Sequence, residues 1–282
     1  MVSNYKFNIS SIAAWTNHHT AKIPVPLTPI LTGGVLWAGA KTKRDSMLKA
    51  FNITKRFGEL TAVDSLSFEV KEGQVFGIAG PNGAGKSTLY NLITGFYGFE
   101  GKIEFDGRDI SGMPPYRIAK AGIARTFQIP QTFPSLSVQK GISAGSRFGA
   151  AGGLDPAHVD EVIRFVELED ERYQKTGLLN LLGKKKLMIG AALATKPKIL
   201  MLDEPMAGCN ANEIRDLMGL IARINQDLGV TIIIIEHFMK VLTELTESLL
   251  IIESGRMICQ GEPAEVIRDP GVIACYLGND DA

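Results

Sequence analysis

Hydrophobic and polar positions divide the chain into an unpatterned start and a regularly patterned remainder. Residues 1–46 show neither the alternation of a strand nor the spacing of a helix, and Pro24, Pro26 and Pro29 lie close together. A regular pattern begins at Met47. We therefore expect a weakly structured N-terminal extension over residues 1–46 and one folded domain over residues 47–282.

The composition of this extension leaves more than one interpretation open. It has no acidic residue before Asp45, which suits a transit peptide, but it lacks amphipathic order. A disordered tail fits better, and so does a translation start at Met47 in place of Met1. The pair His18 and His19 has no nearby metal-ligand companions, so we interpret it as part of the extension.

After Met47 the pattern begins with strands. Residues 49–57 and 65–70 alternate as half-buried strands do, and residues 74–80 form a short apolar run. Residues 86–96 have the apolar recurrence of a helix. The pattern thus predicts a strand, a glycine-rich loop and a helix in succession.

Two later apolar runs predict the centre of a sheet. Residues 198–204 and 231–237 are short, rich in Leu or Ile, and end in polar residues, as parallel strands buried on both faces do. Residues 212–229 between them have helical spacing and a stop signal at Gly229. No internal repeat is visible, so we expect an α/β fold with one nucleotide-binding domain.

The loop that follows residues 74–80 has the spacing of a phosphate-binding loop. Gly80 is followed after four residues by Gly85, Lys86 and Ser87. Glycines let backbone N–H groups face phosphate oxygens, and the next helix directs its positive end at the same anion. Lys86 would pair with the β- and γ-phosphates and Ser87 would bind Mg²⁺. The alternative is a chance match, a glycine turn before a helix that binds no ligand, and the succession of strand, loop and helix disfavours it. The residues that we expect to bind ATP are Gly80, Asn82, Gly83, Gly85, Lys86, Ser87 and Thr88.

Polar residues at the ends of the two later runs complete the candidate chemistry. Asp203 is placed to hold Mg²⁺, and Glu204 to polarise the attacking water, although such a pair often marks only a solvated strand end. His237 ends the next run and is either a satisfied core residue or a contact to the γ-phosphate; we favour the second. We therefore expect Lys86, Glu204 and His237 to be catalytic.

Composition removes other classes of protein. The chain has 282 residues, 45% of them hydrophobic and 21% charged, which suits a globular protein with a core. Its 30 Lys and Arg balance 30 Asp and Glu, so no basic field favours nucleic acid. Cys209, Cys259 and Cys275 are too few for a disulfide framework or a zinc site, and we interpret them as small apolar fillers. No apolar run reaches the roughly 18 residues that a membrane helix needs.

Five motifs in order make the chain resemble the nucleotide-binding subunit of an ABC transporter. The resemblance covers Met47 to about Leu277, and its motifs are GPNGAGKST (80–88), RTFQIP (125–130), ILMLDEPMAG (199–208), IIIIEH (232–237) and GEPAEVIRDPGVIACYLG (261–278). It implies a parallel core sheet, an antiparallel β-subdomain near residues 47–72 and 101–108, and a helical insert near residues 130–180. It also implies that the chain hydrolyses ATP with Mg²⁺ to drive transport.

The resemblance assigns two further residues. The glutamine at the position of Gln128 links the ATP site to the membrane subunits, and we place it with the nucleotide and metal ligands; an ordinary surface glutamine is the alternative. The aromatic at the position of Phe57 stacks on adenine in such ATPases. For Phe57 a core aromatic on an edge strand is nearly as good an interpretation.

The narrower resemblance is to ATP-binding subunits of bacterial branched-chain amino acid importers. The segment GIARTFQIPQTFPSLSV and the tail VIRDPGVIACYLG carry it, and urea and amide importers share much of this pattern. It implies membrane permeases, an external solute-binding protein and a second ATP-binding subunit as partners. It implies a peripheral position on the cytoplasmic face of the inner membrane.

The chain departs from the family pattern where a Leu-Ser-Gly-Gly-Gln motif normally stands. Its counterpart is LNLLG, residues 179–183, in which Asn180 replaces serine and Leu182 replaces a glycine. Lys184, Lys185 and Lys186 follow, either as phosphate contacts or, as we prefer, as a solvated helix face. Asn210 and Phe238 stand where many relatives have aspartate.

These departures keep two other functions open. A catalytically weak regulatory nucleotide-binding subunit is compatible with LNLLG. A soluble ABC ATPase of DNA repair or translation usually has two nucleotide domains or a long coiled coil, which this chain lacks. Our hypothesis is that the chain pairs with a different ATPase, because LNLLG would impair the ATP site across the interface and not its own.

Overall fold

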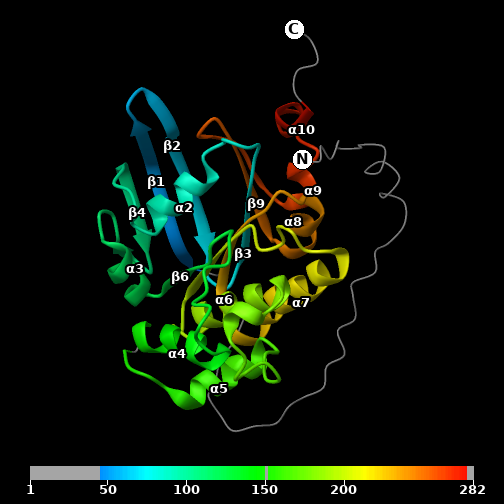
Figure 1. Cartoon of the computed structure of the whole chain (residues 1–282). Coiled ribbons are helices and arrows are strands. Elements are labelled where there is room, and N and C mark those ends of the chain that lie inside the picture. Colours follow the sequence, from blue (N-terminus) through cyan, green and yellow to red (C-terminus); the bar gives the residue numbers. More distant parts are fainter. Residues whose placement is uncertain (1–44, 150–151, 278–282) are drawn as a thin grey trace. The chain divides into compact units, whose positions relative to one another are not determined.

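The computed structural model describes residues 45–149 and 152–277. The expected extension therefore lies, up to residue 44, outside the described residues, and so does the pair His18 and His19. The first strand begins at Ser46. The described residues form two sheets and a set of helices (Figure 1).

The first sheet is antiparallel and has the strand order β2-β1-β4-β5. Its strands are β1 (Ser46–Phe57), β2 (Leu60–Lys71), β4 (Glu100–Phe105) and β5 (Arg108–Asp109). The pairing of β1 with β2 shifts register next to Asn52, which has a φ of 45°. This sheet confirms the expected antiparallel β-subdomain.

The second sheet has the order β10-β9-β3-β8-β7-β6. Its strands are β3 (Val75–Ala79), β6 (Ile123–Arg125), β7 (Ile199–Asp203), β8 (Thr231–Ile235), β9 (Ser248–Glu253) and β10 (Arg256–Gly261). All neighbours pair in parallel except β10, which runs antiparallel at one edge. Strands β3, β7 and β8 are buried at every residue, as their unbroken apolar runs predict.

Alternate residues of the central strands enter two different cores. Leu200 and Leu202 of β7 pack with the helices, whereas Ile199 and Met201 of the same strand pack with the first sheet and α2. Successive side chains of a strand point to opposite faces, so the second sheet lies between the two cores. The carboxyl ends of its strands are thereby held from both faces.

The helices follow the strands in the order of an α/β fold. They are α2 (Lys86–Ile93), α3 (Pro115–Ala121), α4 (Val138–Phe148), α5 (Pro156–Phe165), the 3₁₀ helix η1 (Thr176–Leu178), α6 (Leu181–Leu193), α7 (Ala211–Leu228), α8 (Met239–Leu245), α9 (Pro263–Val266) and α10 (Pro270–Leu277). Helix α7 begins with a capping box between Asn210 and Glu213 and ends at Gly229, which has a φ of 67°. The predicted helix stop at Gly229 is confirmed.

Helices α4 and α5 form the expected helical subdomain with the start of α6. Helix α4 packs on both α5 and α6, as the lower part of Figure 1 shows. Side chains from α4, α5 and α6 enter the same core as one face of the second sheet. Within residues 45–149 and 152–277, no helix is both long and apolar enough to cross a membrane.

Candidate active site

The loop from β3 to α2 has the geometry that its glycines predict. Gly80 and Gly85 have φ values of 151° and 101°. A Cβ at Gly80 would lie 2.0 Å from the Ile252 carbonyl oxygen, and one at Gly85 2.3 Å from that of Ala62. Only glycine fits at both positions, because the loop passes close to neighbouring backbone.

Lys86, the first residue of α2, points back into this loop. Its ammonium donates to the carbonyl oxygens of Gly80 (2.7 Å) and Pro81 (2.9 Å). Burial lowers the pKa of Lys86, and the negative charges of Glu204 and Asp203 oppose that shift. The ammonium therefore lies near both predicted acidic residues, in a position to contact a phosphate at the loop.

Asp203 ends β7 in contact with a residue that the sequence did not single out. Arg125 Nη2 donates to Asp203 Oδ2 at 2.8 Å, and both side chains are 9% exposed. Burial raises the pKa of the Asp203 carboxyl, and the Arg125 guanidinium opposes the shift. No local pattern indicated Arg125, because its partner is 78 residues away.

Glu204, His237 and Gln128 lie together. Glu204 Oε1 lies 2.5 Å from His237 Nε2, and Gln128 Nε2 donates to Glu204 Oε2, also at 2.5 Å. Glu204 has a φ of 46°, a conformation that non-glycine residues rarely adopt and that turns the chain sharply after β7. Three residues predicted from separate segments thus converge. His237 is not an isolated core residue, whereas Gln128 is exposed, so the alternative of a surface glutamine, one that also contacts Glu204, stays open.

Glu236 is a second residue that the sequence analysis missed. It is 1% exposed, and its carboxylate accepts hydrogen bonds from the backbone N–H groups of Met206 (2.7 Å) and His237 (3.1 Å). Burial raises its pKa to about 7. It thus ties the segment after Glu204 to the segment that carries His237. The signal was an acidic residue directly continuing the apolar run 231–235.

Phe57 lies at the end of β1 and is 42% exposed. Its ring meets Tyr97 edge to face at a centroid distance of 5.3 Å, and Lys55 Nζ lies 5.0 Å from its centroid. Strand β1 pairs on both sides, with β2 and β4, so the alternative of a core aromatic on an edge strand is wrong. Stacking of adenine on Phe57 stays a prediction.

The LNLLG segment forms the start of α6. Asn180 is the N-cap residue, and its side-chain oxygen accepts from Gly183 N at 2.7 Å. Leu182 is half-buried against the core, whereas Leu181 is exposed. The branched side chain at the helix start that faces solvent is therefore Leu181, whereas Leu182, which replaces a glycine of the family motif, packs on the core.

The expectation of a solvated lysine face on α6 is wrong for two of the three lysines. Lys185 is 2% exposed and donates to the carbonyl oxygen of Pro205 at 2.5 Å. Lys186 is also buried and pairs with Glu167 at 2.7 Å. Both partners lie far away in sequence, so the charge run alone suggested a surface. Lys185 instead connects α6 to the residue that follows Glu204.

The oxygen donors around the loop suit Mg²⁺. The Asp203 carboxylate and the exposed Ser87 hydroxyl are hard oxygen ligands, and the negative charge of Asp203 acts to raise the pKa of Lys86. Among the described residues, no group of three or more His, Cys, Asp or Glu could hold a metal by itself.

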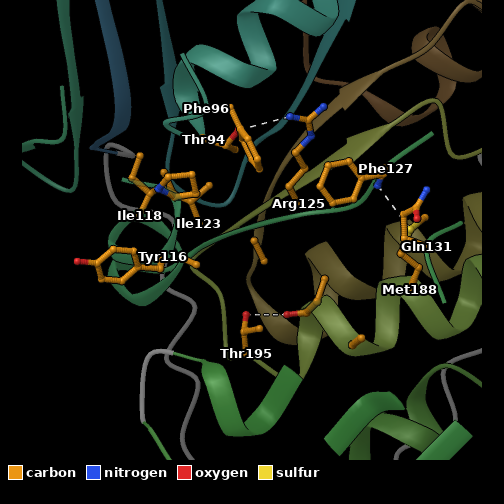
Figure 2. A pocket seen from close by; sticks show the side chains of 15 residues that line it. Thr94, Phe96, Tyr116, Ile118, Ile123, Arg125, Phe127, Gln131, Met188 and Thr195 are labelled. Atoms are coloured by element: carbon orange, nitrogen blue, oxygen red, sulfur yellow. Dashed lines mark hydrogen bonds between the residues drawn. The ribbon is translucent and has the colours of Figure 1, made fainter. Parts of the chain in front are cut away.

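A groove of about 450 Å³ lies between α3 and α6. We call it the α3–α6 groove; side chains that line it include Phe96, Tyr116, Ile118, Arg125, Phe127 and Met188 (Figure 2). Phe96, Tyr116 and Phe127 are exposed. Arg125 thus belongs to the groove and to the candidate site at once.

The glycine-rich loop between β3 and α2, and the acidic residues at the end of β7, which β8 separates from β3 in the same sheet, are typical of a P-loop ATPase. The model of the ABC transporter family matches residues 63–207, and that of the branched-chain amino acid ATP-binding cassette transporter matches residues 256–282. The chain belongs to the ABC transporter family, as its ATP-binding subunit. The resemblance, the fold class and the expected transport ATPase are confirmed.

This chain matches curated relatives over nearly the whole length of each relative. The high-affinity branched-chain amino acid transport ATP-binding protein BraF of Pseudomonas aeruginosa is 34% identical over 249 residues, 82% of this chain and 98% of the relative. The probable branched-chain amino acid transport ATP-binding protein LivG of Methanocaldococcus jannaschii is 33% identical over 256 residues, 83% of this chain and 99% of the relative.

Solved structures of ATP-binding cassettes have the same fold as this chain. A nucleotide-free ATP-binding cassette from an ABC transporter is 31% identical, with a TM-score of 0.76 over 83% of this chain and 100% of that chain. An ATP-binding cassette in its ADP conformation has the same identity, TM-score and coverage. The roles of the individual site residues stay predictions.

Proposed function

We propose that this chain hydrolyses ATP to energise an importer of branched-chain amino acids. The observation that carries the cargo class is the match of residues 256–282 to the model of the branched-chain amino acid subgroup, beyond the general cassette. The names of the curated relatives support the same class. Urea and amides remain the alternative cargo.

The residues of the site divide the work. Backbone N–H groups of the 80–85 loop and Lys86 bind the phosphates, and Lys86 exchanges its contacts with Gly80 and Pro81 for phosphate oxygens. Glu204 accepts a proton from the attacking water after Gln128 and His237, which both contact its carboxylate in this structure, reorient. His237 then contacts the γ-phosphate.

Asp203 and Ser87 hold Mg²⁺ in this proposal, with Gln128 near them. When bound, the ion neutralises charge that develops on the transferred phosphoryl group. Phe57 stacks on the adenine, supported by its exposure and by Tyr97 beside it.

In this proposal a pair of permease subunits forms the pathway through which the substrate crosses the membrane. No described helix can span a membrane, whereas family membership requires a membrane pathway. The α3–α6 groove is apolar, with one guanidinium, and suits a short permease helix that presents an apolar face and an acceptor oxygen. The chain would sit peripherally on the cytoplasmic face of the inner membrane, with an external solute-binding protein delivering the cargo.

The second ATP-binding subunit is a different chain in our proposal. Two cassettes would close over two ATPs, and each site would combine one subunit's phosphate loop with the start of the other's α6. The exposed Leu181 and the side-chain cap of Asn180 alter that start here. A partner with an ordinary Ser-Gly-Gly segment would leave the site on Lys86 competent.

Reconstitution tests the proposal. The chain, its genomic neighbours encoding permeases and second cassette, and the solute-binding protein are placed in proteoliposomes. Leucine, isoleucine or valine should stimulate ATP hydrolysis and enter the vesicles, whereas urea and short amides should not. Stimulation by urea or an amide alone would assign the alternative cargo.

A catalytically weak regulatory subunit is the second candidate, favoured by the altered start of α6. It predicts that Glu204→Gln in this chain leaves hydrolysis by the assembled complex unchanged. A loss of hydrolysis excludes it.

A further inference from the structure

The Arg125 guanidinium bridges two segments of the site. Its Nη1 donates to Asn91 Oδ1 of α2 at 2.6 Å, and its Nη2 to Asp203 Oδ2 at 2.8 Å. Strand β6 ends at Arg125, which leads directly into the segment that carries Gln128. The carboxylate assigned to Mg²⁺ is therefore paired with a cation of the same chain.

Arg125 is also clamped between two aromatic rings. Its guanidinium carbon lies 5.4 Å from the ring centroid of Tyr90 and 4.9 Å from that of Phe127. Tyr90 is fixed, because it is buried and its hydroxyl donates to backbone oxygens of Leu202 and Ile233. Phe127 is 40% exposed and lines the α3–α6 groove beside Arg125 (Figure 2). The Tyr90 ring thus belongs to the core, whereas the Phe127 ring lies at the surface, where an occupant of the groove can displace it.

One hydrogen-bond donor of Arg125 is unused. Among the residues that the structure describes, Arg125 Nε is buried and has no acceptor. A buried donor without a partner destabilises the arrangement. A position of the guanidinium that faces the groove would let an acceptor oxygen of an occupant satisfy this donor.

We propose that Arg125 is a positioning residue that couples the α3–α6 groove to the metal-binding carboxylate. With the groove free, Arg125 pairs with Asp203 and competes with Mg²⁺ for it. When the permease helix proposed above displaces Phe127 and offers an acceptor oxygen, the guanidinium moves toward the groove, and Asp203 becomes available to the ion. This inference rests on the proposed role of Asp203 toward Mg²⁺.

The test measures how Mg²⁺ supports nucleotide binding by the full chain. Binding of a non-hydrolysable ATP analogue is titrated at a series of MgCl₂ concentrations and in EDTA. Arg125→Gln removes the competing cation, so the half-saturating Mg²⁺ concentration should fall about tenfold, with little gain in EDTA. Arg125→Lys keeps a charge but not the fork that contacts Asn91 and Asp203 together, so its shift should be smaller.

Two control variants separate this inference from simpler causes. Arg223→Gln removes a guanidinium with matching contacts, to Glu167 at 2.7 Å and to the Phe165 ring at 5.3 Å, far from the site. It should leave the Mg²⁺ dependence unchanged. Asp203→Asn should abolish the Mg²⁺ dependence; if it does not, the proposed role of Asp203 fails, whatever Arg125 shows.

Phe127 tests the link to the groove. Phe127→Ala loosens one side of the clamp and should lower the half-saturating Mg²⁺ concentration about threefold in the otherwise unchanged chain. In the Arg125→Gln background it should have no further effect, since the ring acts through Arg125. Phe148→Ala, an exposed aromatic of α4, is the matched control without effect.

Thermal melting of each variant shows whether it is folded. If Arg125→Gln does not fold, Arg125→Lys and the exposed Phe127→Ala carry the test. An unchanged or higher half-saturating Mg²⁺ concentration in Arg125→Gln would overturn the competition with Mg²⁺. Equal effects of Phe127→Ala in both backgrounds would overturn the coupling to the groove.

Discussion

Helices α2 and α6 both begin at segments that the resemblance assigns to phosphate binding, yet their first turns differ. Helix α2 follows Gly85, a residue with no side chain to cap the first N–H groups. Helix α6 follows Asn180, whose side chain already accepts from Gly183 N, and then presents the exposed Leu181. Free N–H groups at a helix start attract anions, and a side-chain cap satisfies one of them in advance. The first start is thus open to an anion and the second is partly closed.

Because of this difference, we expect the start of α2 to bind phosphate better than the start of α6. In the proposed assembly, the open start of α2 serves this chain's own ATP, and the capped start of α6 serves the partner's. The acidic residues of the site go with the start of α2, since the charges of Asp203 and Glu204 act to raise the pKa of Lys86. Mutations at the two starts should therefore have unequal effects.

The largest effects should come from the α2 side. Lys86→Ala should weaken ATP binding by about a hundredfold or more, because it removes the cation that faces the phosphates. Glu204→Gln should keep binding and lower turnover by about a thousandfold, because it removes only the proton acceptor. Binding and hydrolysis measured on the same preparations check this, with Lys196→Ala, a surface lysine paired with Asp155, as control. Equal loss of binding in both variants contradicts the division of roles.

Glu236, which fixes the segment after Glu204, should make folding stability depend on pH. Its pKa of about 7 lies above the ordinary 4.5, so the folded chain retains a proton that the unfolded chain has lost between these values. Stability should therefore fall as pH rises from about 4.5 to about 7, by up to about 3 kcal/mol. Glu236→Gln should remove this part of the fall.

Denaturant unfolding at pH 5 and pH 8 measures that difference. Glu69→Gln, on the exposed face of β2, is the matched control and should keep the wild-type dependence. The same fall with pH in Glu236→Gln as in the unaltered chain would rule out Glu236 as its source.

In the assembled complex, the same change can be made in either ATP-binding subunit, and the two losses of activity can be compared. Glu204→Gln in this chain should stop transport, whereas the equivalent change in the partner should lower it only about twofold, because in our proposal the site that uses LNLLG turns over slowly. Hydrolysis and uptake by the reconstituted complex, with each change made separately, measure this. Equal losses, or full activity of this chain as a homodimer, would remove the asymmetry.

The smallest effect should be that of the cap itself. Asn180→Ala removes the acceptor for Gly183 N and should lower the free energy of unfolding by about 1 kcal/mol. Asn180→Ser restores a capping oxygen and should recover most of it. Chemical denaturation of the three proteins provides the measurement, and no loss in Asn180→Ala would show that the cap contributes nothing.

The sequence predicts local features of this molecule well and long-range pairs poorly. Residues 74–80, 198–204 and 231–237 could be identified as central strands because burial on both faces requires unbroken apolar runs. Their polar ends indicated the site, since parallel strands end at one edge of a sheet. Strand β6, which ends at the first residue of RTFQIP, was not identified, because it has only three residues.

The partners of Arg125 and Lys185 could not be predicted. Asp203 and Pro205 lie 78 and 20 residues away from them, and no periodicity reports such a pair. A run of three lysines suggests a surface because charge is usually solvated, and here tertiary contacts prevail. Glu236 could have been identified from the sequence, because an acidic residue that extends a fully buried strand needs internal hydrogen-bond donors.

The sheet enclosed by two cores also determines which amides of the site can open. Backbone N–H groups of β3, β7 and β8 lie in the centre of the sheet under packed side chains on both faces, so their hydrogen exchange requires global unfolding. The segment from Phe127 to Ile129 is exposed and should exchange through local fluctuations. Asp203 is therefore held on one of the slowest-exchanging parts of the protein, whereas Gln128, which contacts the next residue Glu204, lies in one of the fastest.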